Sequence, residues 1–369
     1  MTHSRKRILW VDNAKAFGII AVFFGHIIEQ IFLSYSPKAH LQFKFIYSFH
    51  IPLFFILSGF FARLHDLSFR SFLKNKFLSR IVPVIFFSVL SLPMYMLSVR
   101  DFDIKHLMAQ AALLLIGIPQ FNFVIWFLVC LFTVEIINFF VFPFLHSNRT
   151  RIISGILVFY CIGWLISWKT QLNFHVMQIS KIWCIQQAVM AYSFYLFGYY
   201  IYRSEAIFEK MNSYVNVMVV SISALILFFS FNLNNGPFYQ DTHQVVIVAK
   251  AIYGNPFFFP LTAIAGSLFV ISFSKLVPES RTLIFLGRNT LTLMGLNGML
   301  LFVNKNLVLS VITYISDSSV SIFVLSAILT AVSVVVCVPI VLLLNKYLPQ
   351  LTGAPGLKGT AGLSISSNN

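Results

Sequence analysis

Long, uninterrupted apolar runs are the feature that most constrains the fold of this 369-residue chain. A helix needs about 20 apolar residues to cross the hydrocarbon core of a lipid bilayer. The runs are continuous and do not alternate with polar residues, which argues against a transmembrane β-barrel. The sequence therefore predicts an all-α, polytopic integral membrane protein. Ten spans are expected, at residues 15–34, 45–63, 79–98, 123–145, 151–168, 183–202, 214–231, 257–275, 285–303 and 319–345.

The composition excludes several other classes of protein. Hydrophobic residues make up 58% of the chain and charged residues only 10%, whereas a soluble domain carries about 25% charged residues. These values exclude a soluble globular enzyme, a disordered chain and a fibrous protein. The formal net charge of +15 does not indicate nucleic-acid binding, because Lys and Arg lie between the apolar runs and form no separate basic domain. We expect the lipid bilayer, and no nucleic acid, as a partner.

The remaining segments complete the expected organisation. The stretch 104–118 is apolar but short, so it is expected to be interfacial or re-entrant. Residues 232–256 form the longest loop, which an apolar run near Val245 interrupts. Residues 350–369 are rich in Gly and Ser and predict a disordered cytoplasmic tail after a single membrane domain at 1–349. The four cysteines have no CxxC spacing, so neither disulfides nor a metal site is expected.

The distribution of basic residues predicts the orientation in the membrane. With a cytoplasmic N-terminus, the inside segments and their flanking span ends hold 18 of the 26 Lys and Arg residues. By the positive-inside rule, this bias predicts that both termini are cytoplasmic. The densest inside run extends from Arg63 to Arg80 and includes Lys74 and Lys76. It serves either as a topology anchor or as a site for an anionic cytoplasmic ligand, because phosphates need several fixed cations.

Ionisable side chains inside spans mark a second expected site, because such groups are costly in lipid. His26 and Glu29 lie three residues apart, near one face of the first span. The helix rise places His26 about 12 Å, and His50 of the antiparallel second span about 8 Å, below the outer ends of their spans. Glu135 and Asn297 also fall near mid-depth of their spans. These positions predict a buried polar site.

Two kinds of chemistry fit such a site. A neutral histidine has an unperturbed pKa of about 6.5 and can act as a general base. It can deprotonate a sugar hydroxyl for attack on an acyl thioester, or it can relay protons in a transporter. The sequence carries no GxSxG nucleophile elbow, P-loop or GxGxxG motif that would separate these alternatives. A histidine that only packs or donates a hydrogen bond is the simpler explanation for each position taken alone.

Two runs of sequence resemble the acyltransferase-3 family, and within it the fucose 4-O-acetylase-like membrane acetyltransferases. The first run extends from Trp10 through Lys15 to His26, with ten residues between the basic residue and the histidine. The second is Phe49-His50-Ile51-Pro52-Leu53-Phe54-Phe55-Ile56-Leu57-Ser58-Gly59-Phe60-Phe61. Weaker similarities follow in family order, at Lys74–Pro83, Trp126–Leu128 and Gly287–Leu291.

Two departures from the family pattern affect the expected chemistry. Many members have Arg at the position of Lys15, and lysine lacks the planar fork for a bidentate contact. Many members also have a histidine where this chain has Asn297. An amide can orient a group or donate a hydrogen bond, but it cannot serve as a base at neutral pH.

The resemblance implies a multi-pass enzyme of the plasma (inner) membrane that transfers groups other than amino-acyl groups, most closely an O-acetyltransferase. The donor substrate would be acetyl-CoA or another acyl-CoA, with no bound cofactor. The acceptor would be a hydroxyl of a surface polysaccharide or a lipid-linked glycan. A membrane transporter or exporter of glycan intermediates remains the alternative. The sequence predicts no oligomeric state.

The resemblance also implies roles for individual residues. His26 would be the general base or an acyl-relay residue, His50 would act beside it, and Lys15 would help to hold the donor. Asp12 lies one turn from Lys15 and either pairs with it or caps the helix start. The expected substrate-binding residues are Asp12, Glu29, Lys74, Lys76, Arg80, Trp126, Glu135 and Asn297.

Overall fold

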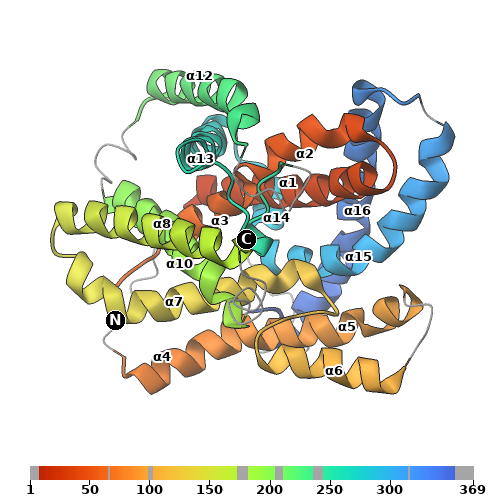
Figure 1. The fold of residues 1–369 in the computed structure, drawn as a ribbon, viewed down its shortest axis with the longest axis horizontal. Helices are drawn as coiled ribbons and strands as arrows, with labels where there is room; N and C mark the ends of the chain where they lie inside the picture. The colour runs from red at the N-terminus through yellow and green to blue at the C-terminus, as the bar shows by residue number, and fades with distance from the viewer. Residues whose placement is uncertain are drawn as a thin grey trace, which may run out of the picture.

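A computed structural model describes residues 8–64, 67–98, 103–172, 182–203, 211–235, 244–314 and 316–353. Across these ranges the chain forms helices and no β-strand, with a single isolated bridge between Ile247 and Ile252. The predicted all-α, polytopic class is therefore confirmed (Figure 1). The α-helices are α1 (Leu9–Ser34), α2 (His40–Tyr47), α3 (His50–Gly59), α4 (Phe69–Lys76), α5 (Val82–Ser98), α6 (Ile104–Leu115), α7 (Trp126–Leu145), α8 (Arg149–Leu172), α10 (Ile185–Arg203), α12 (Ser213–Ser230), α13 (Phe258–Leu276), α14 (Arg281–Arg288), α15 (Thr290–Val311) and α16 (Ser319–Tyr347).

In the described parts of the chain, nine helical stretches are long and apolar enough to cross a membrane. They coincide with nine of the ten predicted spans. The tenth, predicted at 183–202, is the 19-residue helix α10, which is long enough but less apolar. It carries Gln186, Gln187 and several tyrosines, and it packs against α3, α7 and α8. Because protein covers much of α10, its polar side chains are not forced into lipid.

Helix α1 lies at the centre of the molecule and contacts α2, α3, α13, α14, α15 and α16 (Figure 1). Small residues on α1 allow this close packing. Ala14 and Ala16 are fully buried, and a methyl group added at Gly18 would lie 2.8 Å from the Phe54 ring. The helix that carries His26 is therefore fixed by neighbours along most of its length.

The second predicted span, 45–63, is not one continuous helix. It is divided into α2 and α3, with a break at Ser48 and Phe49. Pro52 explains the break: it has no N–H, and its ring would clash with the carbonyl of Ser48 in a regular helix. The break places His50 at the first residue of α3.

Proline also shapes the third span. Helices α4 and α5 are joined by a π-helical segment, η2 (Phe77–Ile81), which ends two residues before Pro83. Pro83 cannot join the regular ladder of hydrogen bonds, and a π-bulge accommodates the disruption without ending the helix. The basic residues Lys74, Lys76 and Arg80 therefore lie on one long helical stretch, Phe69–Leu97.

Two shorter segments were expected outside the spans. Helix α6 has only 12 residues and buries none of them, so it is too short to cross the membrane, as predicted for 104–118. After α16 the chain forms a short turn, η8 (Pro349–Thr352). Residues 354–369, which make up most of the predicted tail, lie outside the described residues.

The crossing of α3 and α10 depends on two glycines, and this gives a stability prediction. A methyl group at Gly59 would lie 1.9 Å from the Tyr195 carbonyl oxygen, and one at Gly198 would lie 2.0 Å from that of Ile56. Gly59→Ala or Gly198→Ala should therefore destabilise the protein by about 1–3 kcal/mol through overpacking. The effect should appear as a lower thermal denaturation midpoint of the purified protein in detergent.

Gly155→Ala is the matched control. Its new methyl group would meet mainly the end of the Leu145 side chain at 2.8 Å, which can move aside. Alanine is also the better helix former by about 1 kcal/mol. Equal midpoints for all three variants would contradict the close approach of α3 and α10.

Candidate active site

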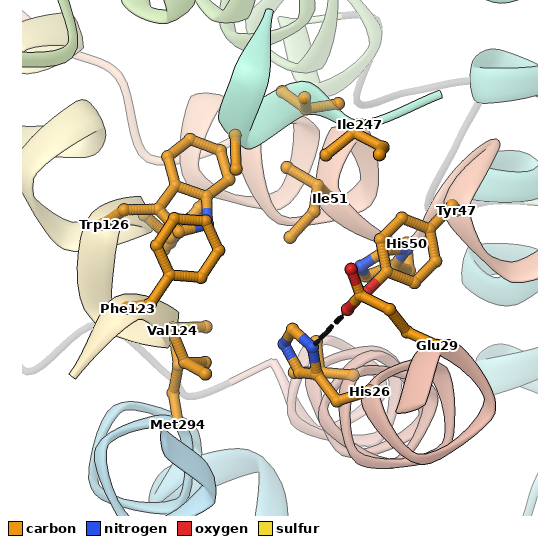
Figure 2. Close-up of a pocket in the computed structure, with 14 residues that line it drawn as sticks. His26, Glu29, Tyr47, His50, Ile51, Phe123, Val124, Trp126, Ile247 and Met294 are labelled. Carbon is orange, nitrogen blue, oxygen red and sulfur yellow. Dashed lines mark hydrogen bonds and ion pairs between the residues drawn. The ribbon is translucent and has the colours of Figure 1, made fainter. Parts of the chain in front are cut away.

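A pocket inside the helical bundle brings together side chains from α1, α2, α3, α7, α15 and the loop before α13. Figure 2 shows the polar groups on one side and aromatic side chains across the pocket from them. The lining residues are Val22, His26, Glu29, Tyr47, His50, Ile51, Phe123, Val124, Trp126, Phe127, Ile247, Val248, Ala249 and Met294. His26 and His50 were expected at a similar depth in neighbouring spans, and both line this one pocket.

His26, Glu29 and Tyr47 form a hydrogen-bonded group at this pocket (Figure 2). Nδ1 of His26 lies 3.2 Å from Oε2 of Glu29. The Tyr47 hydroxyl donates to the same carboxylate oxygen at 2.6 Å and lies 3.3 Å from His26 Nδ1. The Glu29 carboxylate thus has two partners, one from its own helix and one from α2.

These contacts determine which ring nitrogen of His26 is available. A carboxylate only accepts hydrogen bonds, so the contact with Glu29 places a proton on His26 Nδ1. The neutral imidazole then has its lone pair on Nε2, the nitrogen that Glu29 does not engage. A carboxylate that orients a histidine in this way also stabilises the imidazolium that forms when Nε2 takes up a proton.

His50 is held in the same tautomer by a different partner. Its Nδ1 lies 2.8 Å from the Ile46 carbonyl oxygen, which can only accept, so Nδ1 carries the proton and Nε2 is an acceptor. The ring packs edge-on against Tyr47, with centroids 4.7 Å apart. His50 therefore makes the backbone bond expected of a packing residue, and it also lines the pocket.

The opposite walls of the pocket are apolar. Trp126 and Phe123 come from the start of α7 and the turn before it, and Met294 comes from α15. Ile247, Val248 and Ala249 come from a loop that folds into the protein between α12 and α13. Of the residues predicted from sequence, the pocket thus gathers His26, His50, Glu29 and Trp126.

Glu135, in contrast, belongs to a separate charged cluster. Its carboxylate accepts two hydrogen bonds from Arg80, at 3.1 and 3.2 Å, and one from Lys76 Nζ at 2.7 Å. Glu135 lies nine residues after Trp126 on α7, about 14 Å away along the helix axis. It was expected at the level of the histidines, but its partners are the basic residues of α4 and η2.

Asp12 and Lys15 lie near the start of α1, where Lys15 is about 16 Å and Asp12 about 21 Å along the helix from His26. The Asp12 carboxylate lies 3.9 Å from Nε of Arg288 on α14. Lys15 is half-buried, with Nζ 5.6 Å from the centroid of the Phe61 ring. Asp12 thus has a cationic neighbour on another helix that the sequence did not suggest.

The last two predicted site residues lie outside the pocket lining. Lys74 is exposed on α4. Asn297 is 1% exposed on α15, three residues after Met294. Its Oδ1 has no hydrogen-bond partner among the described residues. Across those residues there is also no group of three or more His, Cys, Asp or Glu placed to hold a metal ion.

Sequence reasoning missed two components of the pocket. Tyr47 was not singled out, because a tyrosine near a span end is common and carries no charge. Its position three residues before His50, on the segment that faces α1, was the available signal. The loop wall was noticed only as an apolar run near Val245, and nothing local indicates that this run lies against α1 and α7.

The comparison with known proteins agrees with this geometry. A family model described as an acyltransferase domain, that of the acyltransferase-3 family, matches residues 8–342. Curated proteins and solved structures give no match to the chain. The matched region contains every described helix from α1 to α15, the pocket residues His26 and His50, and the Lys76–Arg80–Glu135 cluster. With nine apolar helices in the described ranges and a family match over most of its length, the chain belongs to the acyltransferase-3 family of membrane acyltransferases.

Proposed function

We propose that this membrane acyltransferase moves an acetyl group from acetyl-CoA to a hydroxyl of a surface polysaccharide or lipid-linked glycan, with His26 as the general base. The observation that carries this proposal is the hydrogen-bonded group of His26, Glu29 and Tyr47 at a pocket inside the bundle. The proposal includes a plasma (inner) membrane location with both termini cytoplasmic, which the 18-to-8 distribution of Lys and Arg supports.

The proposed reaction is a direct acyl transfer. His26 Nε2 takes the proton of the acceptor hydroxyl as its oxygen attacks the thioester carbonyl carbon. The new C–O bond forms, the C–S bond breaks, and the sulfur leaves with the bonding electron pair. The imidazolium returns its proton to that sulfur, so the products are an O-acetyl ester and the CoA thiol. Glu29 stabilises the imidazolium between these two proton transfers.

The second histidine has a supporting role in this scheme. His50 Nε2 is an acceptor at the same pocket, so it can accept a hydrogen bond from the sugar and help to fix the reacting hydroxyl. Trp126 and Phe123 provide flat apolar surfaces across the pocket, suited to the non-polar face of a sugar ring.

The donor is proposed to bind at the basic side of the protein. Lys15, Lys74, Lys76 and Arg80 lie on the predicted cytoplasmic side. Lys76 and Arg80 share one carboxylate, so the cluster with Glu135 keeps a net positive charge. An anionic phosphate group would be attracted to this cluster and to the exposed Lys74.

The alternative of a glycan transporter rests on the same intramembrane histidines. The acyltransferase family supports covalent chemistry instead. Transfer of label from acetyl-CoA to membrane glycans would separate the two functions, because a transporter needs no acyl donor. NMR of the host's surface glycan, with and without the gene, would then identify the O-acetylated position.

The histidine prediction follows from the general-base role. General-base catalysis contributes about 10²–10⁴-fold in rate, so His26→Ala should lose activity by a factor of that order. The measurement is incorporation of labelled acetyl groups into membrane glycans at matched protein levels. If His26 and His50 act as one unit, the double variant should be no worse than His26→Ala.

His146→Ala is the control for loss of an imidazole. His146 contacts the Phe142 and Pro143 carbonyl groups at the end of α7, away from the pocket residues. It should keep wild-type transfer. Near-wild-type transfer by His26→Ala would show that the mechanism is wrong.

Tyr47→Phe tests whether the Tyr47 hydroxyl helps to position Glu29 against His26. The substitution keeps the ring that packs on Phe43 and His50 but removes the donor to Glu29. A hydrogen bond to a charged group contributes about 1.5–3 kcal/mol, and 1.36 kcal/mol is tenfold in rate. Transfer should fall by about tenfold or more at unchanged protein levels. Full activity, with an unchanged pH–rate profile, would mean that the hydroxyl has no part in positioning Glu29.

Substitutions in the basic run can distinguish residues that bind the donor from residues that stabilise the protein. Lys74 is exposed, so Lys74→Gln should raise the apparent KM for acetyl-CoA by up to about fivefold without loss of protein, whereas Lys105→Gln on α6 should leave it unchanged. Arg80→Gln should reduce accumulation, because it removes two of the three hydrogen bonds that the buried Glu135 carboxylate accepts. An unchanged donor KM for Lys74→Gln would leave only the topology-anchor interpretation of this residue.

A further inference from the structure

The loop at residues 244–257 is built as a rigid wall of the pocket. The Ile247 and Ile252 backbones pair in both directions, at 2.8 and 3.1 Å, around the 3₁₀ turn η6 (Val248–Lys250). The turn closes at Ala251, which adopts a left-handed conformation with φ of 56°. A non-glycine residue holds this conformation only where the surroundings enforce it.

Side chains from three neighbouring elements provide that enforcement. Gln187 of α10 donates to the Ala249 carbonyl oxygen at 2.9 Å. Tyr160, Trp164 and Ser167 of α8 donate to the carbonyl groups of Pro256, Gly254 and Ala251. Asn234 accepts from the Asn255 N–H at 2.8 Å. The loop is therefore fixed to the bundle along its length, and its place beside His26 is set by the fold.

Lys250 lies at the edge of this wall, directly after Ala249, which lines the pocket. Its N–H donates to the Ile247 carbonyl oxygen at 2.9 Å, which fixes the start of the side chain. The side chain itself is exposed, and within the described residues its ammonium makes no ion pair or hydrogen bond. No ion pair joins Lys250 to Glu29, the carboxylate that lines the same pocket.

Two other lysines on the same predicted side of the membrane show a different arrangement. Lys38 forms an ion pair with Asp317 at 2.9 Å. Lys44 is buried and donates to oxygens of Asn232 and Asn235. These two cations stabilise connections between helices, whereas Lys250 directly follows a residue that lines the pocket and has no such partner among the described residues.

We propose that Lys250 recognises a negative charge on the acceptor, so that the glycan acetylated here carries an anionic group close to the reacting hydroxyl. The inference rests on the proposed acetyl transfer to a glycan. The negative group is a sugar carboxylate or the phosphate of a lipid-linked precursor, since an ammonium group binds either oxyanion as a point charge. The apolar wall and Trp126 bind the sugar body, and Lys250 selects the charged acceptor at the pocket edge.

The test uses labelled acetyl-CoA and host membranes containing the full-length protein. The labelled ester should bind to an anion-exchange resin. Mild acid, which cleaves sugar–phosphate bonds, should remove the charge if it comes from a lipid-linked phosphate and preserve it if it comes from a carboxylate. A labelled product that is neutral before acid treatment would overturn the inference.

Variants of Lys250 test the residue itself. Lys250→Gln should raise the apparent KM for acceptor membranes by about tenfold with kcat kept, the effect of losing one charged hydrogen bond. Lys250→Arg should remain within about twofold of wild type, and Lys305→Gln, an exposed lysine on α15, should change nothing. A wild-type KM for Lys250→Gln would overturn the inference, as would a fall in kcat alone, which would place Lys250 in support of Glu29.

The two proposals fail in different ways. If wild-type membranes incorporate no label from acetyl-CoA, the proposed transfer fails and the role of Lys250 fails with it. If label enters a neutral glycan in a His26-dependent reaction, the transfer stands and only the anionic acceptor is wrong.

Discussion

A charged side chain within a span must find its partner inside the protein, because lipid tails offer none. The described part of this chain meets that constraint with contacts that join different helices. Glu135 of α7 is bound by Lys76 and Arg80, and Glu29 of α1 is bound by Tyr47 of α2. Each contact gives a partner to a buried or half-buried carboxylate and fixes one helix against another. The same requirement therefore sets both the helix arrangement and the position of the polar groups at the pocket.

Two prolines lie where the helices that form the pocket and the basic cluster depart from regular geometry. Pro52 interrupts the second span and leaves His50 at the start of a helix, with its Nδ1 bonded to a carbonyl of the preceding segment. Pro83 follows the π-helical segment that carries Arg80. A regular helix would place Arg80 at a different angle relative to α7. The pocket and the basic cluster both depend on a local departure from helical geometry.

Much of the fold could be predicted because its signals are local. The apolar runs predict the spans. Because the first two spans run in opposite directions, the sequence also predicts that His26 and His50 lie at a similar depth. Partner choice could not be predicted, because it depends on which helix faces contact each other. Glu135 was expected with the histidines but meets Lys76 and Arg80. The break at Ser48 was missed as well, because the apolar run continues through it unchanged.

The tightly packed α1 fixes the distance between Lys15 near its start and the pocket residue His26. A larger side chain at Gly18 would meet only the neighbouring Phe54 and Leu53 side chains, but a change in the length of α1 between Lys15 and His26 has a different consequence. With 3.6 residues per turn, one inserted residue would turn everything beyond it by about 100° and advance it by 1.5 Å. His26 and Glu29 would rotate together away from Tyr47. The protein would then lose either these contacts at the pocket or the packing contacts of the buried start of α1. Homologous proteins are therefore expected to differ by single substitutions between these two positions but to keep the same number of residues.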